Sequence, residues 1–182
     1  MALAKGELEE TLTLYNWRQT RADYFRRIDG KTAALFSMAA EAGAILSGSP
    51  EEEIQALRIY GINLGRAFQV VDDLLDFTGD EKTMGKPVGS DLMNGVLTLP
   101  AFLYLERFPD GNLIQRGFET RGKGPELRQA VADIRDSDVI GGSFAVARDL
   151  VEKAQSVIKP LPPSESRDSL MALADYVLER RK

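Results

Sequence analysis

The sequence contains neither cysteine nor histidine. The lack of cysteine excludes disulfide bonds, thiolate catalysis and cysteine-ligated metals, and the lack of histidine excludes imidazole acid–base chemistry. Any metal would have to be held by carboxylates, which favour a hard ion such as magnesium. No apolar run approaches the roughly 20 residues of a transmembrane helix, and the first residues, MALAKGELEE, lack the apolar core of a signal peptide. We therefore expect a cytoplasmic protein without a transmembrane segment.

The bulk composition of the 182 residues is that of an ordinary globular protein, with 43% hydrophobic and 28% charged residues. This length is enough for one domain with a real core. The net charge of −5 provides no basic footprint for nucleic acid, and it suits a site that gathers divalent cations. No internal repeat or linker divides the chain, so residues 1–182 are expected to be one domain, or part of one, that binds no nucleic acid.

Helical patterns run through the chain, and the alternating β-branched runs typical of strands are absent. The sequence therefore predicts an all-α fold. Ser49 and Pro50, followed by three glutamates, indicate a strong helix start with a capping hydroxyl and a proline at the first position. We expect a kink near Pro100 and a long glycine-rich loop over 78–95. Helices are expected at 1–16, from Thr20 or Asp23 to 46, at 51–77, around 100, and at 112–119, 125–136, 139–158 and 165–180.

The helix predicted over 51–77 has an unusually narrow polar face. With about 100° between successive residues, its apolar side chains leave a polar arc of only about 120°. A helix that is apolar over most of its circumference is surrounded by other helices. Its polar face, which carries Asp72, Asp73 and Asp76, should therefore line an internal cavity or the mouth of one.

These three aspartates stand close together, at positions i, i+1 and i+4 of one helix. Their carboxylates repel one another, and Arg66 lies two turns from Asp73, too far for a direct pair. A divalent cation would relieve this repulsion. A lone DDxxD is more often a solvated acidic face at a helix end than a metal site, because short acidic motifs arise by chance. The choice between the two depends on the neighbouring motifs.

Several short motifs accompany the acidic helix in a fixed order. They are Lys31-Thr32, Phe68-Gln69, DDLLD at 72–76, Gly85-Lys86 and Thr98-Leu99-Pro100. Together they resemble the trans-prenyltransferase family of polyprenyl diphosphate synthases. DDLLD matches the second aspartate-rich motif of that family, and the others match its KT, FQ, GK and TLP motifs. Such an ordered set is far more specific than any single motif, and it favours the metal site over the solvated face.

The resemblance implies an isoprenoid-synthase-type helical bundle and a magnesium-dependent reaction between an allylic diphosphate and isopentenyl diphosphate. In that family, magnesium held by two aspartate-rich motifs draws off the allylic pyrophosphate. The double bond of isopentenyl diphosphate then attacks the resulting carbocation, and a proton is lost. No side-chain nucleophile is required, which agrees with a chain that lacks cysteine and histidine.

Carried over by position, Asp72, Asp73 and Asp76 would hold Mg²⁺ directly or through waters. Thr32 and Gln69 would form hydrogen bonds to the substrate, or steady the cation and the departing oxygens. These roles are implied by the resemblance alone.

The same resemblance makes Lys31 and Lys86 mobile point charges for the allylic pyrophosphate, and it places Phe68 among the substrate-binding residues. Without the family, Lys31 would be read as a lysine that extends from an apolar stripe to solvent. Lys86 would then be an unexceptional loop lysine.

Other conspicuous residues have structural interpretations. Gly43, Gly61 and Gly65 are expected to permit close helix packing. The pair Tyr24-Phe25 is expected in the core or an interface. Residues 180–182, Arg-Arg-Lys, are expected to form a solvated basic helix end.

The 182 residues contain neither the first aspartate-rich motif of that family nor its basic motif for isopentenyl diphosphate. We therefore expect the C-terminal portion of a synthase, with a bundle that lacks the N-terminal helices. The chain would be a fragment, which we favour, a subunit whose partner supplies the first motif, or a non-catalytic assembly relative. We expect it to be inactive alone. We also expect a homodimer or a complex with a partner chain, because half a bundle leaves apolar surface uncovered.

Overall fold

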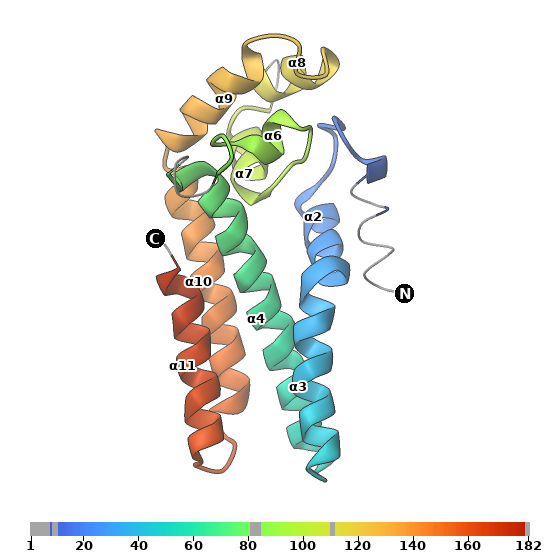
Figure 1. Ribbon diagram of the computed structural model, residues 1–182, viewed down its shortest axis with the longest axis vertical. Coiled ribbons are helices and arrows are strands. Elements are labelled where there is room, and N and C mark those ends of the chain that lie inside the picture. The colour runs from blue at the N-terminus through green and yellow to red at the C-terminus, as the bar shows by residue number, and fades with distance from the viewer. Residues whose placement is uncertain (1–7, 9–10, 81–84, 110–111, 181–182) are drawn as a thin grey trace.

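The computed structural model describes residue 8 and residues 11–80, 85–109 and 112–180. Within these ranges every regular element is a helix and none is a strand, which confirms the expected all-α fold. No helix in the same ranges combines the length and apolarity needed to cross a membrane. Figure 1 shows an elongated bundle built on four long helices: α3 (Ala34–Leu46), α4 (Glu51–Thr78), α10 (Val139–Ile158) and α11 (Glu165–Glu179).

One continuous helical rod begins at α2 (Arg21–Ile28), passes through the π-helical turn η1 (Asp29–Ala33) and continues as α3. Thr20 starts it with a capping box: its hydroxyl accepts a hydrogen bond from the Asp23 N–H, and its own N–H donates to the Asp23 carboxylate. Gly48, with φ of +74°, follows its end. The sequence predicted this helix but not the π turn, whose wider spacing reorients the side chains around it.

The central helix α4 packs along α10 on one side and α3 on the other. Gly61 and Gly65 allow the close approach to the first rod. A Cβ on Gly61 would lie 2.6 Å from the Phe36 carbonyl oxygen, and one on Gly65 would lie 2.6 Å from Ala33 Cα. The predicted packing role of these two glycines is therefore confirmed. It is wrong for Gly43, where an added Cβ would meet nothing within 4 Å.

Two prolines start helices, and both differ in detail from the expectation. Pro50 itself is the N-cap residue of α4, and no side chain caps this helix, so Ser49 is not the capping hydroxyl. Helix α7 (Leu99–Arg107) begins one residue before Pro100. In the first helical turn a proline loses no hydrogen bond, because the N–H it lacks would have no partner there. The expected kink at Pro100 is therefore wrong, and this proline lies in the first turn of α7.

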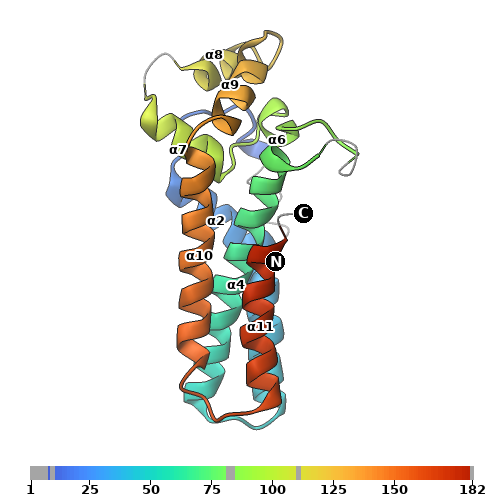
Figure 2. The ribbon, with the colours of Figure 1, turned by 90° about the vertical axis from the view of Figure 1, so that its left-hand side faces the viewer.

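Short helices cover one end of the bundle, as both ribbon views show (Figure 2). One of them lies within the segment 78–95, which was predicted to be loop throughout. It follows Gly89, whose φ of +71° and close approach to the Val131 side chain of the neighbouring helix both suit a residue without a side chain. The short helices are α6 (Ser90–Met93), α8 (Leu113–Glu119) and α9 (Glu126–Arg135).

The helix expected over 1–16 falls largely outside the described residues. Where the chain is described, Leu8, Thr11 and Leu12 are helical, and residues 13–15 form a turn. Tyr15 has a φ of +56°, which is incompatible with a continuing right-handed helix. The helix therefore does not reach residue 16.

Candidate active site

The DDLLD segment forms the last turns of α4, beside the end covered by the short helices. Asp72 is half-exposed, whereas Asp73 and Asp76 are buried. As expected, Arg66 does not neutralise them: its Nε and Nη2 donate to the Asp29 carboxylate at 2.5 and 2.6 Å. Side chains from other parts of the chain reach all three: Tyr24 reaches Asp73, Lys86 reaches Asp76 and Arg180 reaches Asp72.

Asp73 points into the protein, where a tyrosine and a glutamine hold its two oxygens. The Tyr24 hydroxyl donates to Oδ2 at 2.6 Å, and Gln69 Nε2 donates to Oδ1 at 3.0 Å. Burial raises the pKa of Asp73 to about 7, although both hydrogen bonds lower it. Burial also raises the pKa of Tyr24 well above its ordinary value, with the nearby Asp73 charge adding to the effect, so this hydroxyl remains a donor. Asp73 is therefore a buried carboxylate that lacks full charge compensation.

A hydrogen-bonded relay links the KT, FQ and DDLLD motifs. The Thr32 hydroxyl donates to Gln69 Oε1 at 2.6 Å, and the Gln69 amide in turn donates to Asp73. Thr32 lies in the π turn and Gln69 on α4, so the relay links the first helical rod to the central helix. Because Thr32 occupies the amide oxygen, the amide nitrogen of Gln69 is directed at Asp73. The three motifs thus meet at one site, as the resemblance implied.

Asp76 is held by the segment that follows the acidic helix. Ser90 Oγ donates to its Oδ1 at 2.8 Å, and the Asp91 backbone N–H donates to its Oδ2 at 3.1 Å. Lys86 Nζ lies 2.7 Å from Oδ1 and 3.7 Å from an Asp91 carboxylate oxygen. The loop lysine of the GK motif is therefore folded back onto the aspartate motif.

Asp72 is reached from the far end of the chain. Arg180 Nη2 lies 3.0 Å from Asp72 Oδ1, and the guanidinium stands over the Phe68 ring at 4.2 Å from its centroid. Partial burial raises the pKa of Asp72, an effect that Arg180 and Lys86 oppose. Arg180 was expected to be solvated, and this expectation is wrong: its side chain is 28% exposed and contacts the predicted site.

A small polar cavity of about 110 Å³ lies beneath Asp73. Lys31 is partly buried and contributes to the wall of this cavity, so it lies beside the predicted site. Thr98, of the TLP motif, is buried there, and its hydroxyl has no hydrogen-bond partner among the described residues. The cavity brings together Tyr24, Arg27, Ile28, Lys31, Gln69, Asp73, Asp91, Val96 and Thr98.

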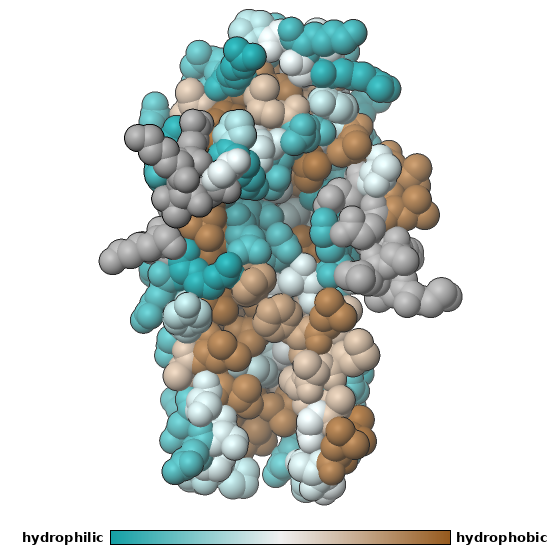
Figure 3. All heavy atoms as spheres, in the orientation of Figure 1, coloured by the Kyte–Doolittle hydropathy of each residue, from teal (hydrophilic) through white to brown (hydrophobic). Residues whose placement is uncertain are grey.

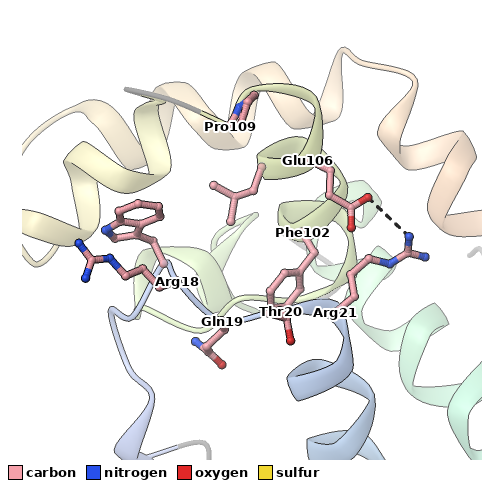
Figure 4. A pocket seen from close by; sticks show the side chains of 9 residues that line it. Arg18, Gln19, Thr20, Arg21, Phe102, Glu106 and Pro109 are labelled. Carbon is pink, nitrogen blue, oxygen red and sulfur yellow. Dashed lines mark ion pairs between the residues drawn. The ribbon is translucent and has the colours of Figure 1, made fainter.

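A larger hollow of about 540 Å³ lies away from these motifs, between the start of α2 and α7 (Figure 4). Its wall includes Trp17 and Phe102, and Arg21 faces Glu106 across it at 3.5 Å. None of the residues predicted to act in the site lines it. This hollow is several times larger than the cavity beside Asp73, yet the motifs converge on the smaller cavity.

The outer surface is divided along the long axis of the bundle. In Figure 3, hydrophilic side chains gather at mid-height, and hydrophobic ones predominate below them, over the lower parts of the long helices. Several large apolar side chains are exposed on the long helices, including Met38 of α3, Ile59 of α4 and Leu173 of α11. The polar site therefore adjoins an extended apolar surface.

The donor set fits a divalent cation, although its ligands do not converge as they stand. Among the described residues no three acidic side chains form a ready metal cage. Carboxylate oxygens on adjacent helical turns are nevertheless suitable ligands for a hard ion. Lys86 and Arg180, which now compensate Asp76 and Asp72, are long side chains that are 45% and 28% exposed. A cation at this face would replace them.

Solved structures share the arrangement of the helices. The chain superposes with a TM-score of 0.92 and 37% identity on a heptaprenyl diphosphate synthase from Staphylococcus aureus, covering 100% of this chain and 57% of that one. A polyprenyl synthase from Caulobacter crescentus CB15, complexed with calcium and isoprenyl diphosphate, gives 0.89 at 34% identity, with 100% and 56% covered. The helices thus define a protein of the isoprenoid synthase fold.

Sequence comparison identifies the family. Residues 1–134 match the profile of the family described as Polyprenyl synthetase. The chain is 36% identical over 176 residues to heptaprenyl diphosphate synthase component 2 of Bacillus subtilis (strain 168), which covers 97% of this chain and 50% of that protein. This chain belongs to the polyprenyl synthetase family. It spans about half the length of the curated relatives it matches.

Sequence reasoning missed Tyr24 and Arg180 as members of the site. Tyr24 was assigned to the core, where its ring does lie, but its hydroxyl contacts Asp73. Neither residue lies in a short motif with the aspartates. A buried carboxylate requires hydrogen-bond donors, so the sequence could have indicated only that Asp73 has such partners and not which residues they are.

Proposed function

We propose that this chain carries the second aspartate-rich metal site of a trans-prenyltransferase that condenses an allylic diphosphate with isopentenyl diphosphate. The observation that carries the proposal is the relay from Thr32 through Gln69 to Asp73, which joins three family motifs beside one polar cavity. A helix that merely exposes an acidic face to solvent needs no such relay. The reaction of the whole enzyme is part of the proposal, because the chain spans about half of its relatives.

In this proposal Asp72, Asp73 and Asp76 hold Mg²⁺, directly or through waters. Bound magnesium supplies positive charge to the oxygens of the departing pyrophosphate. Lys86 lies on the same face and leaves Asp76 to bind the pyrophosphate, as a mobile point charge. The exchange keeps the buried Asp76 compensated, since one cation replaces another.

Lys31 and Thr32 stand on the neighbouring rod. Lys31 faces the cavity and would bind the allylic pyrophosphate from that side. Thr32 orients Gln69, and Gln69 orients Asp73. Phe68 packs against Phe36 at a ring-centroid separation of 5.3 Å and lies under Arg180, so it provides an apolar surface next to the charged site.

Partners form a further part of the proposal. The Bacillus subtilis relative is named as component 2 of its synthase. We propose that this chain likewise acts together with another chain, either a second copy or a separate partner that supplies the first aspartate-rich motif. The exposed apolar side chains below the site are consistent with such an association.

The metal site is tested by calorimetric titration of the chain with MgCl₂, with and without inorganic pyrophosphate. We expect weak binding of magnesium alone and markedly tighter binding with pyrophosphate, whose oxygens complete the coordination that these carboxylates leave open. Asp72→Ala combined with Asp73→Ala should abolish the coupled binding. Asp149→Ala, an exposed carboxylate paired with Lys153 on α10, is the matched control. Coupled binding that survives in the double variant would move the site elsewhere.

The enzymatic part is tested by turnover of an allylic diphosphate with isopentenyl diphosphate. We expect none from these 182 residues alone. Activity should appear when the segment of the Bacillus subtilis relative that this chain does not match is supplied as a separate chain. Coupled magnesium binding without any reconstituted turnover would favour the non-catalytic assembly role.

A further inference from the structure

A buried hydrogen bond joins Tyr24 of α2 to Asp73 of the acidic turn. The hydroxyl-to-carboxylate distance is 2.6 Å, across 49 positions of sequence. The tyrosine is 0% and the aspartate 5% exposed, so bulk solvent has little access to this bond. A short hydrogen bond to a carboxylate in such surroundings is stronger than one between neutral groups at a surface.

Neighbouring side chains hold the ring of Tyr24 in place independently of its hydroxyl. Phe25 meets it edge to face at 5.2 Å between ring centroids, and Phe102 of α7 lies at 5.8 Å. The Arg27 guanidinium stands 5.7 Å from the ring centroid, and it donates to the Leu97 carbonyl oxygen. Packing from α2 and α7 thus restricts the position of the hydroxyl in addition to its bond with Asp73.

The two donors on Asp73 determine how its carboxylate is presented. A carboxylate has about four lone-pair sites. Tyr24 takes one on Oδ2 and Gln69 takes one on Oδ1, so rotation about the terminal torsion would break both bonds. The remaining lone pairs therefore have fixed directions. Gln69 is itself braced by Thr32, and the tyrosine is the second, independent brace.

We infer that Tyr24 is a positioning residue of the metal site: its hydroxyl holds the Asp73 carboxylate in the orientation from which it binds a divalent cation together with pyrophosphate. This inference rests on the proposed function and extends it to a residue outside the aspartate motif. Donors behind a metal ligand fix its orientation, and their loss costs roughly tenfold to a hundredfold in metal affinity. Tyr24 acts through Asp73 and does not touch the ion.

Tyr24→Phe removes the hydroxyl and keeps the ring and its packing. The matched control is Tyr60→Phe. Tyr60 is also buried, at 1% exposed, and its hydroxyl donates a 2.7 Å hydrogen bond to the Leu170 carbonyl oxygen of α11, away from the acidic turn. Each variant removes one tyrosine hydroxyl and its hydrogen bond, and the two bonds have similar lengths, 2.6 and 2.7 Å. Both tyrosines belong to the same hydrophobic core. A merely structural role would therefore affect them alike.

The experiment titrates MgCl₂ into each variant with inorganic pyrophosphate present and follows thermal unfolding in the same buffer, which contains sucrose to favour the folded state. We expect Tyr24→Phe to weaken the pyrophosphate-coupled magnesium affinity about tenfold. Tyr60→Phe should match the wild-type affinity, even though both variants unfold at lower temperature.

Equal affinities for the two variants, with both folded, would overturn the inference and leave the proposed function standing. Absence of coupled binding in the wild-type chain would instead remove the proposed function itself. A Tyr24→Phe chain that stays unfolded in sucrose while Tyr60→Phe folds would also overturn it, because the hydroxyl would then serve the fold.

Discussion

Arg180 and Asp72, separated by most of the chain, form an ion pair of 3.0 Å at the edge of the acidic turn. The guanidinium also covers the Phe68 ring, so the end of α11 is fastened to α4 by charge and by stacking at once. The arrangement compensates Asp72 when no other cation does. A divalent cation that binds Asp72 therefore has to compete with Arg180.

This competition yields the first prediction. Arg180→Gln should raise the affinity for Mg²⁺ alone about twofold to fivefold, since a half-exposed pair is worth at most about 1 kcal/mol. Calorimetry without pyrophosphate measures the change. Lys153→Gln removes an exposed pair with Asp149 and serves as the control. A lowered affinity in Arg180→Gln would show that the arginine assists the site and does not compete for it.

The second prediction concerns the clamp between Asp29 and Arg66. The pair joins the π turn to α4 through two parallel hydrogen bonds of 2.5 and 2.6 Å. Both side chains are about one-third exposed, so we expect Arg66→Met to lower the free energy of unfolding by only about 0.5–1 kcal/mol. The exchange Asp29→Arg with Arg66→Asp should recover part of it. Urea unfolding of the wild type, Asp29→Arg, Arg66→Asp and the double variant gives the coupling energy, and an energy near zero would mean that the contact does not hold the turn.

The third prediction compares Gly61, at a close helix contact, with Gly43, which has open space around it. Gly61→Ala should destabilise the protein by about 1–3 kcal/mol, because the new Cβ would meet backbone atoms of α3 at 2.6 Å. Gly43→Ala should be neutral or stabilise by up to about 1 kcal/mol, since it removes backbone freedom in a helix with open space around it. Denaturant midpoints measure both, and similar values for the two variants would refute the packing explanation.

The fourth prediction concerns pH. The folded pKa of Asp73, about 7, lies above its ordinary value of 3.8, so between these values the folded state binds more protons than the unfolded state. Stability should therefore fall as pH rises through this window, with a slope from this group of at most about 1.4 kcal/mol per pH unit. Asp73→Asn should flatten that part of the slope. Urea unfolding from pH 5 to 8 in EDTA compares the two chains, and parallel slopes would exclude Asp73 as the source.

The fifth prediction is association. Large apolar side chains remain exposed on α3, α4 and α11, among them Leu46, Ile59 and Leu173. Apolar surface of this extent recruits a partner, so we expect a homodimer in sedimentation at micromolar concentration. A monomer that binds no hydrophobic dye would contradict this and would strengthen the non-catalytic interpretation.

Much of the fold was predictable, because it depends on local patterns. Apolar periodicity placed α4 within a residue of its observed end, and the acids after Pro50 marked its start. The predictions failed where the same residues are compatible with two local backbone structures. Pro100 was expected to bend a helix and instead starts one, and the π turn has no signature in the residues that form it.

The sequence by itself determined which groups the site contains, since the aspartates, lysines and polar partners lie in short ordered motifs. Only the tertiary structure decided how each carboxylate is compensated. Tyr24 reaches Asp73, Lys86 reaches Asp76 and Arg180 reaches Asp72. Burying a carboxylate is costly unless donors or cations reach it. Which residues meet that requirement depends on helix packing that brings together positions up to 108 residues apart, and no local pattern encodes such contacts.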